Sequence, residues 1–192
     1  MKHFFLSLMS LSALLLCSCA KEYIPYEVLQ VPKYKSIYTA YTLWYTDPLK
    51  MTSENIQTGE IIPFGTEAVI TKMTDQEICF NAMGKEFRIE LIDRNMETAH
   101  LFLKRTFSVK NADELTAGTS AGDFEKMRRG VVTEGMTEEQ VLVAYGRPSL
   151  FRTPVLTIDT WIYQTGPVKS KRIIFQKKDK ESPRTVARIF EL

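Results

Sequence analysis

The chain has few of the residues on which disulfide-rich exported domains and metalloenzymes depend. Only 3 of its 192 residues are cysteine and only 2 are histidine. Zinc sites need three or four cysteine, histidine or carboxylate ligands, and no spacing in the sequence supplies such a set. The sequence also lacks a glycine-rich loop followed by lysine and serine or threonine, the usual phosphate-binding pattern. We therefore expect no metal site and no cofactor, and the net charge of +2 gives no indication of nucleic-acid binding.

The start of the chain has the pattern of an export signal. A short basic start precedes an apolar run over residues 4–16. That run is shorter than the roughly 18 residues that a membrane-spanning helix needs, and no later run approaches this length. The following Leu16-Cys17-Ser18-Cys19 resembles the lipobox of bacterial lipoprotein precursors. The resemblance implies that residues 1–18 are a signal peptide and that Cys19 is lipidated; the alternative is an ordinary cleavable signal without lipid.

Lipidation of Cys19 would hold the protein at a bilayer surface, because each buried methylene of an acyl chain contributes about 0.8 kcal/mol. In lipoproteins that this chain resembles, Ala20 rather than aspartate after the anchor implies sorting to the outer membrane. We therefore expect an outer-membrane protein that faces the periplasm. Once Cys17 is removed and Cys19 is acylated, Cys79 is the remaining thiol. Packing rather than internal disulfides must then stabilise the fold.

The charges divide the mature chain into two parts. Residues 19–123 contain 11 basic and 15 acidic side chains, a net charge of −4, whereas residues 124–192 contain 13 and 8, a net charge of +5. This change predicts two small domains with a boundary near residue 120. Residues 19–35 contain prolines and charges without a sustained period, which indicates a tether. Residues 108–122 are small and polar, which indicates a linker.

Residues 36–107 are rich in aromatic, β-branched and turn-forming residues, which predicts a small all-β barrel. Within it we expect one strand over residues 37–46, a hairpin over residues 77–92, and a short strand over His100-Leu101-Phe102-Leu103. The stretch from Gly59 to Val69 also resembles the diverging turn of bacterial SH3-like domains. The alternative is an unrelated five-stranded barrel or sheet.

Residues 123–192 change from a strand-like to a helical period. Phe124, Met127 and Val131 share one helical face after a candidate N-cap at Ser120, and Gly130 is the expected end of this first helix. An amphipathic helix therefore opens the second domain.

A second helix is predicted by Thr137-Glu138-Glu139-Gln140, which has the pattern of a capping box. We expect this helix to bury Val141, Ala144 and Tyr145 and to stop at Gly146 and Pro148. The predicted fold class is therefore α+β, a small SH3-like barrel followed by an ααβββ two-layer domain. The three strands that complete it are expected at residues 159–165, 171–177 and 185–192.

Several spaced residues of the second domain resemble those of a known family. The pattern combines Gly135-Met136-Thr137 and Gln140, a turn with Gly146 and Pro148, and a strand with Trp161 and Tyr163. It resembles the SmpA/OmlA (BamE-like) domain. The resemblance implies a non-enzymatic outer-membrane lipoprotein that assists the machinery inserting β-barrel proteins. Typical small members lack the β-rich region found here, so a sibling envelope lipoprotein is the alternative.

We expect these motif residues to be mainly structural, with Trp161 and Tyr163 packed on the two helices as core side chains. Catalysis needs a nucleophile beside a base or a pair of carboxylates in a cleft. Cys79 and His100 offer the one candidate dyad of the mature chain, and we expect both to be buried structural residues. The sequence therefore predicts no enzyme.

The best candidate for a binding surface is a basic stretch near the C-terminus. Lysine and arginine side chains attract anionic lipid headgroups at about 1 kcal/mol each, although a solvated hairpin is the alternative. The function that we expect is a scaffold for envelope proteins, and the alternatives are peptidoglycan binding by the SH3-like region or a protein inhibitor. The basic residues are Lys169, Lys171, Arg172, Lys177, Lys178, Lys180 and Arg184.

Overall fold

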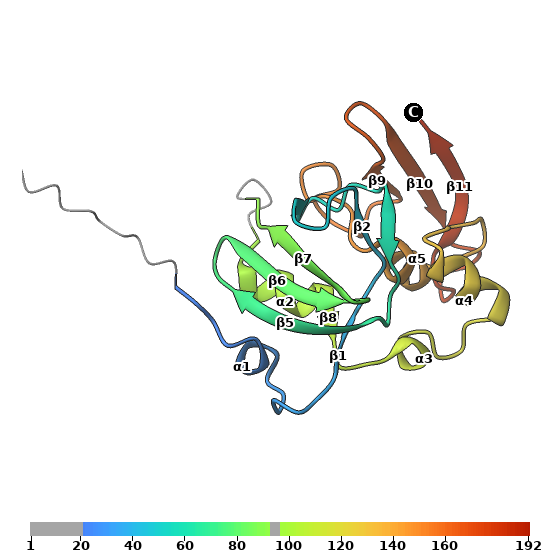
Figure 1. Ribbon diagram of the computed structural model, residues 1–192. Helices are drawn as coiled ribbons and strands as arrows, with labels where there is room; N and C mark the ends of the chain where they lie inside the picture. The colour runs from blue at the N-terminus through green and yellow to red at the C-terminus, as the bar shows by residue number, and fades with distance from the viewer. Residues whose placement is uncertain (1–20, 93–96) are drawn as a thin grey trace, which may run out of the picture.

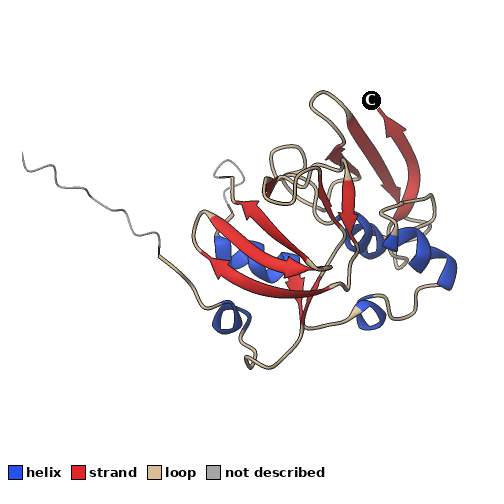
Figure 2. Ribbon diagram, viewed as in Figure 1, coloured by secondary structure: helices blue, strands red, loops and turns tan. Residues whose placement is uncertain are grey.

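The computed structural model describes residues 21–92 and 97–192. Its fold is mixed α+β, with a curled sheet that forms a half-barrel, two smaller sheets and a few short helices (Figures 1 and 2). The expected signal peptide and Cys19 lie outside the described residues. Within these residues, every helix falls short of the length and apolar character that crossing a membrane requires.

The first described residues pack against the half-barrel, so the expectation of a tether is wrong for residues 21–35. The backbone N–H of Tyr23 donates to the carbonyl of Met73 over 2.8 Å. Helix α1 (Pro25–Leu29) follows, and its Val28 is buried in the first core. Pro25, one of the prolines that indicated a tether, has another role here, because proline at the first position of a helix has the backbone angle that the helix needs.

A six-stranded sheet forms the half-barrel, and its strand order is β3-β7-β6-β5-β1-β8. All of its pairs are antiparallel except β3 with β7. The predicted hairpin is confirmed as β6 and β7, and its two turn residues, Met83 and Gly84, both have positive φ angles, as tight hairpins require. The strands are β1 (Ile37–Thr39), β3 (Met51–Thr52), β5 (Glu67–Met73), β6 (Glu77–Ala82), β7 (Lys85–Glu90) and β8 (Phe107–Ser108).

Residues 37–46 do not form the single strand expected. They divide into β1 and β2 (Leu43–Tyr45), and β2 pairs with β4 (Glu60–Ile62) in a separate two-stranded sheet. The break occurs at buried Thr42, whose backbone N–H donates to the carbonyl of Val143 over 3.1 Å. The chain leaves the first sheet there because it docks on the C-terminal part of the molecule.

The short strand expected at residues 100–103 is also wrong, because these residues lie in helix α2 (Ala99–Thr106). Thr98 caps this helix by accepting a hydrogen bond from the N–H of Leu101. The helix buries Ala99, Phe102, Leu103 and Thr106 and contacts α1 and β6. A run of four residues is too short to distinguish a helical period from a strand.

The C-terminal part contains the helices and strands expected, together with one additional helix. Ser120 and Thr137 both cap helices as predicted, and the three strands form an antiparallel sheet of order β11-β10-β9. The linker expected at residues 108–122 is not wholly irregular, because an Asn111 capping box starts a one-turn helix within it. The elements are α3 (Ala112–Leu115), α4 (Ala121–Arg128), α5 (Glu138–Tyr145), β9 (Thr160–Gln164), β10 (Ser170–Gln176) and β11 (Thr185–Glu191).

Helix α4 ends in a left-handed turn that takes Val131 out of the core position expected for it. Gly130 has a φ of +62°, its N–H donates to the carbonyl of Met127, and the N–H of Val131 donates to the carbonyl of Lys126. These two bonds form a Schellman motif. Because the helical period stops there, Val131 is 38% exposed, whereas Met127 is buried.

Two hydrophobic cores lie side by side, one under the half-barrel and one between the C-terminal sheet and α4 and α5. Residues from the β-rich region enter the second core. Phe64 is fully buried there, with its ring 5.5 Å from that of Phe124, and Trp44 packs edge-on to Tyr145. The side-chain amide of Asn55 also donates to the carbonyl of Tyr145. The two parts of the chain are therefore joined by packed side chains as well as by the connecting segment.

Candidate binding surface

The residues of the C-terminal motif come together in the second core. Met136, Trp161 and Tyr163 are each no more than 2% exposed. The indole N–H of Trp161 donates to the carbonyl of Leu156 over 3.1 Å, and the Tyr163 hydroxyl donates to the carbonyl of Gly146 over 2.8 Å. Burial raises the pKa of Tyr163 well above its usual value. Trp161 and Tyr163 are therefore side chains of the second core.

The remaining motif residues shape the ends of α5. The N–H of Gln140 donates to the Thr137 hydroxyl, and the side chain of Gln140 accepts from the N–H of Thr137, which completes the capping box. Gly135 and Gly146 both have positive φ angles, and Pro148 is buried. The motif therefore starts and stops a helix and places its side chains inside.

The basic stretch does not form one surface. Lys169 and Lys171 lie at the start of β10, whereas Lys177, Lys178 and Lys180 lie at or beyond its end. A strand of seven residues is about 23 Å long. The two groups of lysines are therefore at opposite ends of the sheet.

Two of the basic residues are already engaged within the molecule. The ammonium of Lys171 lies 3.0 Å from the Tyr145 hydroxyl and 3.3 Å from the Glu191 carboxylate. Arg184 is only 12% exposed and binds the carboxylates of Glu138 and Asp159 and two backbone carbonyls. These contacts compensate the charge of Arg184, which joins the segment before β9 to the start of α5.

Cys79 and His100 have separate surroundings. Cys79 is buried on β6, and its burial raises the pKa of the thiol, which favours the unreactive protonated form. His100 lies on α2 and is half-buried, with its ring 4.4 Å from that of Tyr23 in an edge-on arrangement. Among the described residues, no three histidine, cysteine or acidic side chains gather as a metal site would require.

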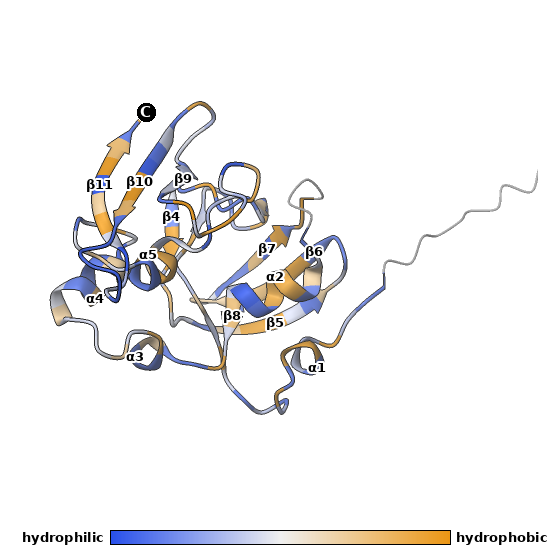
Figure 3. Ribbon diagram, turned by 180° about the vertical axis from the view of Figure 1, so that it is seen from behind, coloured by the Kyte–Doolittle hydropathy of each residue, from blue (hydrophilic) through white to orange (hydrophobic). Residues whose placement is uncertain are grey.

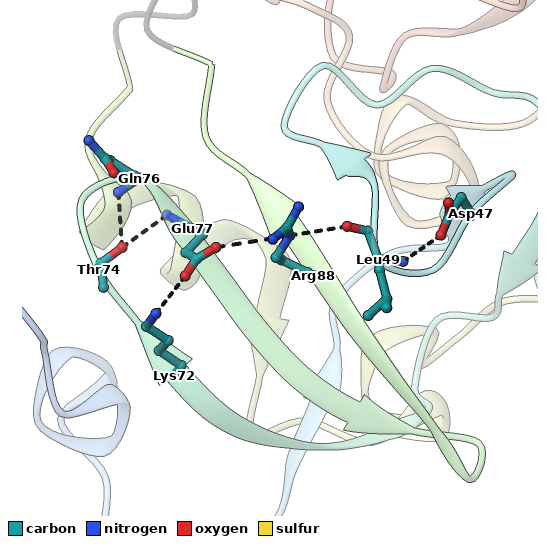
Figure 4. Close-up of polar contacts among 7 residues, drawn as sticks. All are labelled: Asp47, Leu49, Lys72, Thr74, Gln76, Glu77 and Arg88. Carbon is teal, nitrogen blue, oxygen red and sulfur yellow. Dashed lines mark hydrogen bonds and ion pairs between the residues drawn. The ribbon is translucent and has the colours of Figure 1, made fainter. Parts of the chain in front are cut away.

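The outer face of the half-barrel has charged side chains that satisfy one another (Figure 4). Glu77 binds the ammonium of Lys72 at 2.7 Å and lies 4.0 Å from the guanidinium of Arg88. Arg88 also donates to the carbonyl of Leu49, whose N–H donates to Asp47. The hydrogen bond that the Lys72 ammonium donates to Glu77 raises the pKa of Lys72, and the hydrogen bond from the backbone N–H of Leu49 lowers the pKa of Asp47.

A hollow of about 460 Å³ lies beside this network. Its volume is within the range of small-molecule sites, but Glu77 and Arg88 in its lining already lie 4.0 Å from each other as an ion pair. The lining residues are Gln76, Glu77, Arg88, Glu90 and Leu91.

The solvent-facing side of the C-terminal sheet carries a different set of side chains. Arg172 on β10 lies between Ile162 on β9 and Phe190 on β11, and one step along the sheet Ile174 lies between Thr160 and Arg188. Both arginines are exposed and Phe190 is 43% exposed, whereas the alternate residues point into the second core. We call this surface the outer sheet face. It consists of Thr160, Ile162, Arg172, Ile174, Arg188 and Phe190.

The composition of the outer sheet face is typical of a protein interface. Such interfaces are enriched in arginine and aromatic residues and depleted in lysine and carboxylates, and the outer sheet face has two arginines and a phenylalanine without lysine or carboxylate. In Figure 3 the upper part of β10 is hydrophilic and its lower part, toward the arrowhead, is hydrophobic. Of the basic residues expected at a binding surface, only Arg172 lies here.

Sequence reasoning missed the outer sheet face because the last strand does not keep a period of two along its whole length. Val186 is buried, and a register shift in the pairing of β10 with β11 places Arg188 and Phe190 on the opposite side of the sheet. The pairing partners, not the local charge density, decide which side chains share a face.

No protein family, curated protein or solved structure among those compared matches the chain. The resemblance to the SmpA/OmlA (BamE-like) and SH3-like domains therefore depends on the spaced residues described above.

Proposed function

We propose that the chain is a non-catalytic lipoprotein of the bacterial outer membrane that faces the periplasm and holds partner proteins on its outer sheet face. The observation that carries this proposal is the grouping of Arg172, Arg188 and Phe190 on an open sheet surface without carboxylates. The matching partner surface is apolar with acidic groups, because buried arginines need carboxylate partners.

The finer fold assignment and the cellular role belong to the same proposal. We assign residues 36–107 to an SH3-like barrel and residues 123–192 to an ααβββ two-layer domain of the SmpA/OmlA (BamE-like) type. The central position of Trp161 and Tyr163 in the second core supports the latter assignment. By that resemblance, the partners are envelope proteins that assemble outer-membrane β-barrels.

The lipid anchor is supported by the sequence before the first described residues. An apolar run ends in Leu16-Cys17-Ser18-Cys19, and acylation there would keep the body at the membrane. Replacing Cys19 with alanine should release the protein from sedimented membranes. Mass spectrometry of the native protein that finds an unmodified sulfur at this position would contradict the anchor.

The docking surface is tested by capture of partners from detergent-solubilised envelope. The variant Arg172→Glu/Arg188→Glu should retain at least tenfold less partner protein than the wild-type chain, because its new negative charges would face the acidic groups of the partner. The matched control is Lys178→Glu/Lys180→Glu, which makes the same charge change on the hairpin and should retain them. Equal retention by both variants would refute the assignment of the surface.

Cell-wall binding is the second candidate, and the polar hollow beside Glu77 and Arg88 is the observation that favours it. The wild-type protein should then sediment together with purified peptidoglycan, whereas an Arg88→Ala variant should stay in the supernatant. If the protein stays in the supernatant while envelope proteins are captured, the scaffold function is favoured.

A further inference from the structure

We propose that residues 21–35 form a membrane-contacting foot, which presses the body against an anionic lipid bilayer through Tyr34, its flanking lysines and Ile24. This inference rests on the lipid anchor proposed above and adds how the body is oriented on the membrane. The foot is defined as residues 21–35, from Lys21 through α1 to Lys35.

The foot is fixed to the half-barrel rather than free. The backbone N–H of Tyr23 donates to Met73 over 2.8 Å, its hydroxyl donates to Asp75 over 2.7 Å, and Glu22 forms an antiparallel bridge with Thr74. Helix α1 then contacts α2 and buries one of its side chains in the first core. The position of Lys21 is therefore set by the fold.

The distance from the lipid to this fixed point is short. Two residues of fully extended chain span at most about 7 Å, and Lys21 follows Cys19 by two positions. If the acyl chains on Cys19 are in the bilayer, Lys21 lies at the level of the headgroups. A body attached so closely cannot stand away from the membrane, so some part of it must contact the lipid surface.

The side chains of the foot suit that contact. Tyr34 is 89% exposed and Ile24 is 46% exposed. Tyr34 stands between the exposed Lys33 and Lys35 on a turn that is closed by the N–H of Lys35, which donates to the carbonyl of Pro32 over 2.9 Å. Tyrosine is enriched at the membrane–water interface, and each lysine near an anionic surface contributes about 1 kcal/mol.

The charges around Tyr34 are favourable overall. The foot has three lysines, and the two carboxylates that oppose them are Glu22 and Glu27. The ammonium of Lys21 also lies 5.1 Å from the centre of the Tyr23 ring. The two lysines that flank Tyr34 are therefore the main electrostatic contribution to binding.

The orientation leaves the proposed docking surface accessible. Figure 1 shows the chain entry, α1 and the following loop along the lower left of the molecule, with β9, β10 and β11 at the upper right. Figure 3, from behind, shows the same separation. A body resting on the foot would thus present the outer sheet face away from the bilayer.

The test uses the lipidated full-length mature protein, reconstituted in vesicles of phosphatidylcholine and phosphatidylserine whose acyl chains carry bromine. In the variant Tyr34→Trp, bromine should quench the added indole fluorescence at least threefold more than in the control Val168→Trp. Val168 is 92% exposed on the turn between β9 and β10, far from the foot. The signal of the native tryptophans is subtracted with the unsubstituted protein.

The outcomes separate the foot from the anchor. Adding Lys33→Glu and Lys35→Glu to Tyr34→Trp, or using phosphatidylcholine alone, should reduce the quenching at least twofold. Quenching that neither change reduces would overturn the electrostatic part of the proposal. Equal quenching at positions 34 and 168, in protein that still floats with the vesicles, would overturn the foot while leaving the anchor intact. Protein that does not float at all would refute the anchor itself.

Discussion

Replacing Gly130 with alanine tests whether the β-rich region and the C-terminal part are held together by close packing. Gly130 follows α4, where its φ is +62°, and a Cβ built on it would lie 2.5 Å from the ring of Trp44 on β2. Real Cβ atoms do not approach other atoms so closely, so either Trp44 or the end of α4 must move. The same substitution at Gly135 has no such neighbour, although its φ is +87°.

The two substitutions therefore differ in one physical respect. A left-handed backbone costs an alanine about 1–2 kcal/mol at either position. Displacing a packed ring adds about 1–3 kcal/mol at Gly130 alone. For a protein of this size, about 1 kcal/mol corresponds to roughly 2–4 °C in Tm. We expect Gly130→Ala to lower Tm by roughly 4–20 °C and Gly135→Ala by roughly 2–8 °C.

Thermal and urea unfolding followed by far-ultraviolet circular dichroism would measure both values. A double-mutant cycle then identifies the cause, because in a Trp44→Ala background the cost of Gly130→Ala should fall to that of Gly135→Ala. The reasoning is refuted if the two glycine variants are equally stable, or if the cost at Gly130 persists without the Trp44 ring.

Three further predictions follow from individual side chains. Thr137→Ala removes the capping box of α5 and should lower the free energy of unfolding by about 1 kcal/mol in urea titrations, whereas no change would mean that the cap is dispensable. The Cys79 thiol, whose pKa is raised by burial, should react with a thiol reagent at pH 8 at least tenfold more slowly in the native protein than in urea; equal rates would contradict the burial. Burial also raises the pKa of Glu97 above its usual value despite the nearby Arg105 and Arg147. The folded state then binds this proton more tightly, so the free energy of unfolding should decrease as pH rises from about 4.5 through the raised pKa. Glu97→Gln should flatten that slope in urea titrations at successive pH values, and an unchanged slope would rule out Glu97 as its source.

Local chemistry explains which elements could be predicted. The capping pair of Thr137 and Gln140 lies within one turn of helix, and the turn residues Met83 and Gly84 lie next to each other in the chain. The strand predicted at residues 100–103 was wrong because a run of four residues fits either period, and only contact with α1 and β6 selects the helix.

The candidate surface could be predicted only in part for a related reason. Charge density along the chain indicated the basic stretch, but the lysines at its two ends are separated by the length of β10, and Lys171 and Arg184 are bound within the molecule. Arg172 and Phe190 became neighbours through the pairing of β10 with β11. That register is a long-range property, because it depends on which residues the second core accepts.

The amino-acid sequence by itself determined the capped helices, the hairpins and the alternation along the strands, because hydrogen bonds and side-chain periods act over a few residues. The tertiary structure alone decided that Thr42 breaks a strand to dock on Val143, that residues 21–35 are fixed to the half-barrel, and which side chains share the outer sheet face. Those outcomes depend on burial between segments far apart in the chain, where the free energy of packing exceeds local preference.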